Sequence, residues 1–189
     1  MQEAVPTGGA MTAVIGLDNE TIERVCSETE GVVSVANYNC PGQTVITGEE
    51  NAVAAAAAAM KEAGAKRCMP LKVSGPFHSA MLAEAGEKLA KELEHVEIHD
   101  ISVPYITNVT ADYVTDKSQV KELLKQQISS SVRWQQSVER MIADGVEIFI
   151  EIGPKKSLTG FLKKIDKSVA AYHVDTMADL DALCEAVLQ

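Results

Sequence analysis

The first third of the chain alternates between apolar runs and helix-forming segments in an order that few folds accommodate. Short β-rich runs predict strands at residues 10–16, 32–38, 43–47 and 66–73, and helices are predicted at 20–28 and 49–63. Asp18 or Asn19 is a suitable N-cap for the first helix, and Gly64 ends the second. A Pro-Gly pair places a turn at residues 39–42. The order strand–helix–strand–strand–helix–strand is that of a ferredoxin-like, split βαβ domain.

From residue 74 onward the pattern becomes an alternation of single strands and helices. Helices are predicted at residues 78–95, 119–128, 135–143, 157–165 and 177–188, and strands at 103–109, 146–152 and 169–174. Segment 146–152 is nearly continuous in apolar and β-branched residues, as is usual for a strand that is buried on both faces of a parallel sheet. This alternation predicts a doubly wound parallel sheet, although about three strands are fewer than such a sheet usually contains.

The two patterns together define the expected organisation. The fold class is α/β, with an α+β small subdomain at residues 1–73 and a parallel-sheet region at residues 74–189. The second region has the elements of the latter half of a larger domain. We therefore expect that further chain precedes residue 1 in the protein from which this sequence comes.

Composition excludes several classes of partner. The chain has 17 basic and 27 acidic residues, a net charge of −10, and only 4% aromatic residues, which argues against nucleic acid and anionic membranes. No apolar run approaches the length of about 18 residues that spans a bilayer, and the N-terminus does not resemble a secretory signal. The four cysteines form no C-x-x-C pair. We expect reduced thiols and a cytoplasmic location.

His78 is the strongest candidate for chemistry among the four histidines. It follows a Gly-Pro turn, at the predicted start of a helix, where a neutral imidazole can serve as a general base. The alternative is a surface or capping histidine. His95 and His99 stand among acidic residues and are expected to be solvated, whereas His173 lies in an apolar strand and is expected to be a satisfied core residue. The histidine spacing predicts no metal site.

Segment 151–160, EIGPKKSLTG, predicts a strand, a tight turn and the start of a helix. Such a helix start can bind a phosphate, but the segment lacks the P-loop pattern, so a plain connection between strand and helix is favoured. No G-x-S-x-G elbow occurs, and no cysteine stands in a nucleophile motif. The chain itself therefore offers no evident nucleophile.

Several motifs in a fixed order carry a resemblance to a known family. They are GAMTAVIGL at residues 9–17, NYNCPGQ at 37–43 with VITG at 45–48, GPFHS at 75–79 and EIGP at 151–154. In this order and spacing they resemble the malonyl-CoA:acyl carrier protein transacylases of bacterial fatty acid synthesis, over essentially all 189 residues. The resemblance favours the functional interpretation of His78 over the capping one.

The resemblance implies a fold, a mechanism and roles for particular residues. It implies an α/β-hydrolase-like large domain, of which residues 74–189 are the C-terminal part, with the ferredoxin-like subdomain inserted. A serine takes the malonyl group from CoA as an ester, and the pantetheine thiol of acyl carrier protein removes it. His78 would be the general base, and the Gln127 backbone carbonyl would hold its ring. Phe77 would favour malonyl over branched acyl groups, and Asn37 and Asn39 would lie near the cleft between the domains.

The resemblance also indicates what this sequence lacks. The family's oxyanion loop, nucleophilic serine and carboxylate-binding arginine would all precede residue 1, so the chain would be inactive without the missing N-terminal portion. No cofactor is implied, because malonyl-CoA is a substrate. Two other functions remain open: a binding module for acyl carrier protein, and a transferase for another acyl group. The acidic net charge disfavours the binding module unless the basic residues Lys155, Lys156, Lys163, Lys164 and Lys167 outweigh it.

Overall fold

A computed structural model describes residues 7–187, which form two compact units. The first unit runs to Ser137 and the second begins at Val138. We describe each unit by itself. The subdomain boundary that we expect between residues 73 and 74 remains a prediction.

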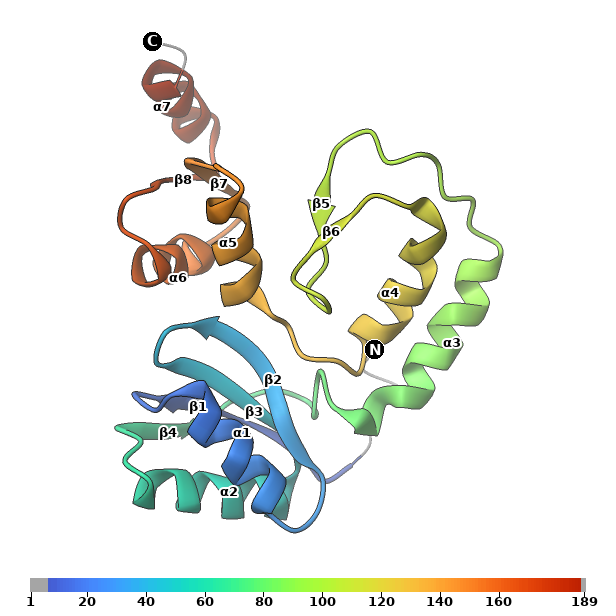
Figure 1. The fold of residues 1–189 in the computed structure, drawn as a ribbon, viewed down its shortest axis with the longest axis vertical. Helices are drawn as coiled ribbons and strands as arrows, with labels where there is room; N and C mark the ends of the chain where they lie inside the picture. The colour runs from blue at the N-terminus through green and yellow to red at the C-terminus, as the bar shows by residue number, and fades with distance from the viewer. Residues whose placement is uncertain (1–6, 188–189) are drawn as a thin grey trace. The chain divides into compact units, whose positions relative to one another are not determined.

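The first unit contains a four-stranded sheet with two helices on one face (Figure 1). Its strands are β1 (Gly9–Ile15), β2 (Val33–Cys40), β3 (Gln43–Glu49) and β4 (Arg67–Pro70), and its helices are α1 (Asn19–Glu28) and α2 (Glu50–Glu62). The strand order is β2-β3-β1-β4, and every neighbouring pair is antiparallel. This arrangement confirms the ferredoxin-like, split βαβ prediction.

Local sequence signals account for the helix ends in this sheet-and-helix layer. The Asp18 carboxylate accepts a 2.8 Å hydrogen bond from the Thr21 amide and so caps α1, as predicted. Gly64 follows α2 with a φ of +106°, a conformation that costs glycine little. The core between helices and sheet consists of buried apolar side chains, including Val14, Ile22, Ile46, Val53 and Met60.

Three sequence predictions for this unit need correction. Strand β2 continues through Asn39 to Cys40, so the turn is confined to residues 41–42. Strand β4 is shorter than predicted. The long strand expected at 103–109 is reduced to β5 (Tyr105–Ile106), which pairs with an unpredicted strand, β6 (Tyr113–Val114). The chain turns between them, because the Ala111 amide donates to the Thr107 carbonyl over 2.9 Å.

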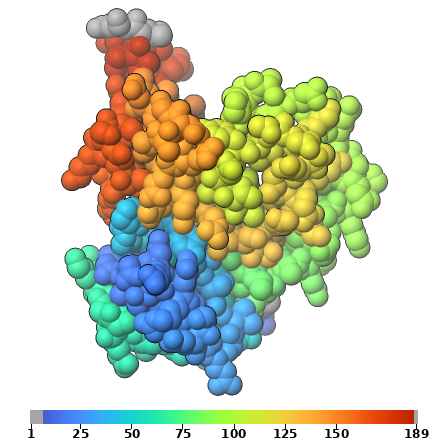
Figure 2. Space-filling view, viewed as in Figure 1, coloured from blue at the N-terminus to red at the C-terminus, as the bar shows by residue number. Residues whose placement is uncertain are grey.

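The rest of the first unit is mainly helical. A 3₁₀ turn, η2 (Ala80–Leu82), leads into α3 (Ala83–Glu94), and η3 (Lys117–Gln119) leads into α4 (Val120–Gln127). Helices α3 and α4 lie side by side and antiparallel, as Figure 1 shows, and their side chains form a continuous surface in Figure 2. Helix α5 (Trp134–Ala143) follows and crosses into the second unit.

The second unit is built on two parallel strands, β7 (Ile148–Ile152) and β8 (Ala170–Val174), joined by α6 (Ser157–Ile165) and followed by α7 (Met177–Val187). The βα alternation is as predicted, but the parallel sheet has two strands among the described residues. The expected burial of β7 on both faces is wrong for this unit: Ile148 and Ile150 are 44% exposed and Ile152 is 82% exposed. These alternate side chains share one face of β7, whereas α6 packs on the other face, where the Thr159 amide donates to Glu151.

Candidate active site

The Gly-Pro-Phe-His segment forms a tight turn that keeps His78 outside the helix that follows. Pro76 is fully buried, and the Phe77 amide donates to the Gly75 carbonyl over 3.0 Å. His78 has a φ of 57°, in the left-handed region that few non-glycine residues adopt. The Ser79 hydroxyl then caps η2 by accepting from the Met81 amide over 3.2 Å. His78 was expected at the helix start; it lies one residue before the cap instead.

The structure brings His78 and Gln127 together across 49 residues of sequence. His78 Nδ1 lies 3.0 Å from the Gln127 backbone oxygen. A carbonyl oxygen only accepts hydrogen bonds, so this contact requires a proton on Nδ1, and in the neutral ring Nε2 then keeps its lone pair. The Gln127 side-chain nitrogen lies 3.3 Å from the same ring nitrogen and cannot donate to it in this tautomer.

Phe77 lies beside His78 in sequence and packs on the face of the sheet opposite the helices. Its ring contacts a buried cluster of small and medium side chains, Met11, Ala13, Ala36 and Val45. The anchored ring and the buried Pro76 hold the turn against the sheet, which fixes the backbone that carries His78.

Asn37 and Asn39 both lie on β2. This strand pairs with Val132, which follows α4, and the sequence did not predict this pairing. The Tyr38 amide donates to the Val132 carbonyl over 2.9 Å, and the Val132 amide donates to the Ala36 carbonyl over 2.7 Å. Asn37 and Val132 thus form a parallel bridge. The segment after α4 therefore extends the sheet at β2. Its sequence gives no strand signal.

The start of α6 is a possible phosphate site by sequence, but the Glu151 side chain occupies it. The Glu151 carboxylate accepts from the Leu158 amide over 3.1 Å, and from the Thr159 amide and hydroxyl over 2.7 and 2.6 Å. Burial disfavours the charged carboxylate, but these bonds outweigh it, so the Glu151 pKa lies below its usual value. The EIGP motif is therefore a helix cap, and the plain strand–helix connection is the better interpretation.

The other three histidines have no comparable arrangement. His95 and His99 are exposed, as predicted. His173 Nε2 lies 2.7 Å from the Gly153 carbonyl oxygen, while its buried Nδ1 has no hydrogen-bond partner among the described residues. The expectation of a satisfied core histidine is therefore confirmed at one ring nitrogen only.

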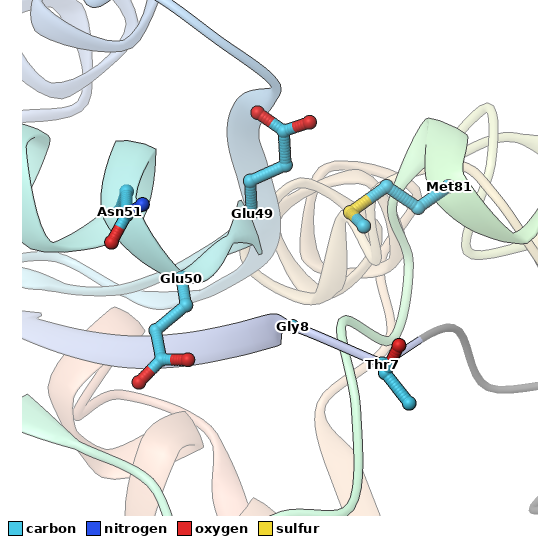
Figure 3. A pocket seen from close by; sticks show the side chains of 6 residues that line it. All are labelled: Thr7, Gly8, Glu49, Glu50, Asn51 and Met81. Carbon is cyan, nitrogen blue, oxygen red and sulfur yellow. The ribbon is translucent and has the colours of Figure 1, made fainter.

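The described residues also form a pocket lined mainly by polar side chains. The pocket, of about 420 Å³, lies between the start of β1, α2 and η2 (Figure 3). The carboxylates of Glu49 and Glu50 there point away from each other in Figure 3, and Glu49 accepts from the Val32 amide over 3.0 Å. Within residues 7–187 no group of histidine, cysteine and acidic side chains is placed to hold a metal ion. None of the described helices combines the length and apolarity needed to cross a membrane.

Comparison with known proteins adds independent information to this geometry. A family model described as "Acyl transferase domain" matches residues 1–180. The malonyl CoA-acyl carrier protein transacylase of Bacillus subtilis strain 168 is 48% identical over 171 residues, which is 88% of this chain and 54% of that protein. The Haemophilus influenzae protein of the same name is 45% identical over 188 residues, 98% of this chain and 60% of its own length.

Solved structures agree with these relatives. An acyl carrier protein S-malonyltransferase from Vibrio cholerae matches with a TM-score of 0.94 and 46% identity over 97% of this chain and 61% of that chain. A malonyl-transacylase solved in complex with a type II polyketide acyl carrier protein matches with a TM-score of 0.94 and 42% identity, over 98% of this chain and 61% of that chain. The present chain thus spans between 54% and 61% of these proteins' lengths.

Proposed function

Because this chain belongs to the acyl transferase domain family, we propose that it forms the histidine-bearing part of an enzyme that transfers malonyl from CoA to acyl carrier protein. The observation that carries the proposal is the 3.0 Å contact from His78 Nδ1 to the Gln127 carbonyl. It leaves Nε2 as the free base of a ring whose orientation is held by backbone. A general base needs both properties.

In this proposal His78 moves one proton in each half of the reaction. A serine hydroxyl from outside this chain attacks the thioester carbon of malonyl-CoA while His78 Nε2 takes the hydroxyl proton. The carbon–sulfur bond breaks, and the proton passes from Nε2 to the leaving CoA sulfur. Nε2 then takes the proton of the pantetheine thiol, whose sulfur attacks the serine ester, and returns that proton to the serine oxygen.

Substrate selectivity in this proposal comes from residues next to the base. The Phe77 ring is held against the sheet by the apolar cluster. Beside the base it would leave little room for a branched acyl group. Asn37 and Asn39 lie on β2, the strand that pairs with the segment following Gln127, and would contact the passing pantetheine. The arginine that binds the malonate carboxylate would come, like the serine, from outside this chain.

The remaining parts of the proposal concern partners and location. The enzyme acts in the cytoplasm and requires no cofactor beyond its malonyl-CoA substrate. A segment corresponding to the rest of the relatives' length would supply the nucleophile and cover the exposed side chains of β7. Transfer of another acyl group is an alternative function. Comparing kcat/KM for malonyl-CoA and methylmalonyl-CoA distinguishes the two.

A second candidate function, binding of acyl carrier protein without catalysis, is favoured by one observation. Lysines are exposed on α6 and the turns that flank it, at Lys155, Lys156, Lys163, Lys164 and Lys167. They concentrate positive charge on an otherwise acidic chain, and a positive patch attracts an acidic carrier protein.

Joining this chain to the part of the Bacillus subtilis relative that it does not span tests both candidates. We expect the joined enzyme to transfer radiolabelled malonyl from CoA to acyl carrier protein, and the 189-residue chain alone to transfer none. Carrier binding by the chain alone is measured in parallel by fluorescence anisotropy. Tight binding by the chain with no transfer by a folded joined enzyme would favour the binding module and contradict the transferase.

A further inference from the structure

Helix α3 has a glycine in its interior, where a better helix former is usual. Gly86 is the buried residue of α3. A Cβ atom at Gly86 would lie 3.0 Å from the backbone oxygen of Lys125, 3.7 Å from Lys125 Cγ and 3.8 Å from Ile128 Cβ. The first of these separations is shorter than side chains normally tolerate. The missing side chain is what allows α3 and the end of α4 to approach this closely.

The two residues that lie closest to Gly86 stand on either side of Gln127, whose carbonyl contacts the His78 ring. Lys125 precedes Gln127 by two residues, and Ile128 follows it directly. Helix α3 in turn is connected to His78 through the short η2 turn. The separation of α3 from α4 therefore affects the distance between His78 Nδ1 and the Gln127 carbonyl, together with the packing of Pro76 and Phe77 on the sheet.

Polar contacts hold the same two helices in register. Lys125 Nζ lies 2.8 Å from the Glu87 carboxylate, next to Gly86 in sequence. At the other end of the pair, Lys121 Nζ lies 3.5 Å from the Glu94 carbonyl oxygen. Because α3 and α4 are antiparallel (Figure 1), the two contacts fix the register while Gly86 fixes the spacing.

We propose that Gly86 is a positioning residue for His78: its missing side chain places the Gln127 carbonyl within hydrogen-bond distance of Nδ1 and so selects the tautomer with Nε2 free. The proposal deepens the proposed function and rests on His78 being its general base. A larger side chain at position 86 pushes the end of α4 outward, lengthens the Nδ1 contact and releases the ring.

A second helical glycine gives a matched control. Gly160 lies inside α6, and a Cβ atom there would have no neighbour within 4 Å. Replacing Gly86 or Gly160 by leucine or alanine improves helix propensity equally. The two substitutions differ in that only position 86 meets another helix.

Nitrogen NMR of the His78 ring in the 189-residue chain tests the proposal without reference to turnover. We expect the unaltered chain and Gly160→Leu to carry the ring proton on Nδ1, and Gly86→Leu to lose that preference. A folded Gly86→Leu chain with the unaltered tautomer would overturn the proposal. If Gly86→Leu does not fold, Gly86→Ala decides: a larger change in the ring signals than in Gly160→Ala supports the proposal, and an equal one overturns it.

Turnover by the joined enzyme gives the second measurement. A ring released from its partner loses alignment, so Gly86→Leu should lower kcat by about 10- to 100-fold while KM changes by less than about two-fold. A rise in KM with kcat unchanged would overturn the positioning role. Failure of the proposed function is distinguishable, because replacing His78 itself would then leave transfer unaffected whatever the NMR result at position 86.

Discussion

The two sheets of this protein differ in how far their apolar side chains are buried. The β2-β3-β1-β4 sheet buries apolar residues on both faces, against α1 and α2 on one side and with Phe77 packed on the other. The β7-β8 sheet leaves alternate isoleucines of β7 exposed. The first sheet has side chains packed on both faces, whereas in the second α6 packs on the Glu151 face of β7 and the isoleucines lie on the opposite face. The apolar pattern of a strand thus indicates that burial is needed, and the elements packed on each face decide whether it is achieved.

Replacing His78, which lies in the first unit, should have the largest effect. His78→Asn should lower malonyl transfer by the joined enzyme by about 10²- to 10⁴-fold, because a positioned general base contributes that much. Asparagine is chosen because it tolerates the left-handed φ of this position better than alanine does. Thermal melts should change little. His173→Asn is the control, and an equal loss of kcat in that folded variant would show that the base is assigned to the wrong histidine.

Truncating one isoleucine in each sheet tests the comparison directly. Ile46 is fully buried in the first sheet, so Ile46→Ala should cost about 2–5 kcal/mol of unfolding free energy. Ile150→Ala, at an exposed position of β7, should change it by less than about 0.5 kcal/mol. Urea denaturation of both variants, at a concentration low enough to keep the chain monomeric, measures the difference. Equal losses there would mean that other parts of the same chain cover β7, and would break the contrast between the sheets.

The exposed side chains of β7 should make the chain associate with itself. Replacing Ile148, Ile150 and Ile152 together by threonine keeps β propensity and removes apolar surface. Since burying one such side chain is worth about 1.5–3 kcal/mol, the dissociation constant should rise by at least about ten-fold. Sedimentation equilibrium of the chain measures this. A strictly monomeric unaltered chain that melts cooperatively would contradict the prediction.

Phe77 should affect selectivity more than rate. Phe77→Ser opens space beside His78, so it should narrow the preference for malonyl-CoA over methylmalonyl-CoA by about ten-fold, mainly by improving the branched substrate. The ratio of kcat/KM for the two thioesters, before and after the change, gives the answer. Equal use of both thioesters by the unaltered joined enzyme would remove Phe77 as the determinant.

The smallest expected effect is the pH dependence of the α6 cap. The Glu151 pKa is lowered in the folded chain, so its stabilisation is present above the carboxyl's unfolded pKa and is lost as pH falls through the lower folded value. Glu151→Gln should therefore cost at most roughly 1 kcal/mol at pH 7, and less as the pH falls. Urea denaturation at pH 7 and in acid measures both costs. A cost that is equal at both would show that the charge of the carboxylate contributes nothing.

Predictions from the sequence succeeded where the responsible contacts are close along the chain. The N-cap at Asp18, the bounds of α6 and the strand–helix order of the four-stranded sheet and of the second unit all depend on periodicity, propensity and capping within a few residues. The turn carrying His78 was also evident from its Gly-Pro pair. The left-handed φ of His78 was not predicted, because it depends on Pro76 and Phe77 being packed against a distant sheet.

Predictions failed where the outcome depended on partners far along the chain. The segment at 103–109 has strand-forming residues, but only two of them found a pairing partner, in β6. The pairing of Val132 with β2 has no sequence signal, since backbone hydrogen bonds do not depend on side-chain type. The plain strand–helix connection favoured at α6 is confirmed, but its cap could not be predicted, because only the folded β7 brings Glu151 to the amides of α6.

The sequence by itself thus determined the order of the elements, the ferredoxin-like topology and the histidine that could act as a base. These follow from local propensity, from the period of apolar residues and from short motifs. Only the tertiary structure decided that the Gln127 carbonyl lies 3.0 Å from His78 Nδ1, that Gly86 lies against the Lys125 backbone, and that the isoleucines of β7 are exposed among the described residues. Each of those depends on atoms brought together from distant parts of the chain, whose separation is set by packing and is not encoded in any local pattern.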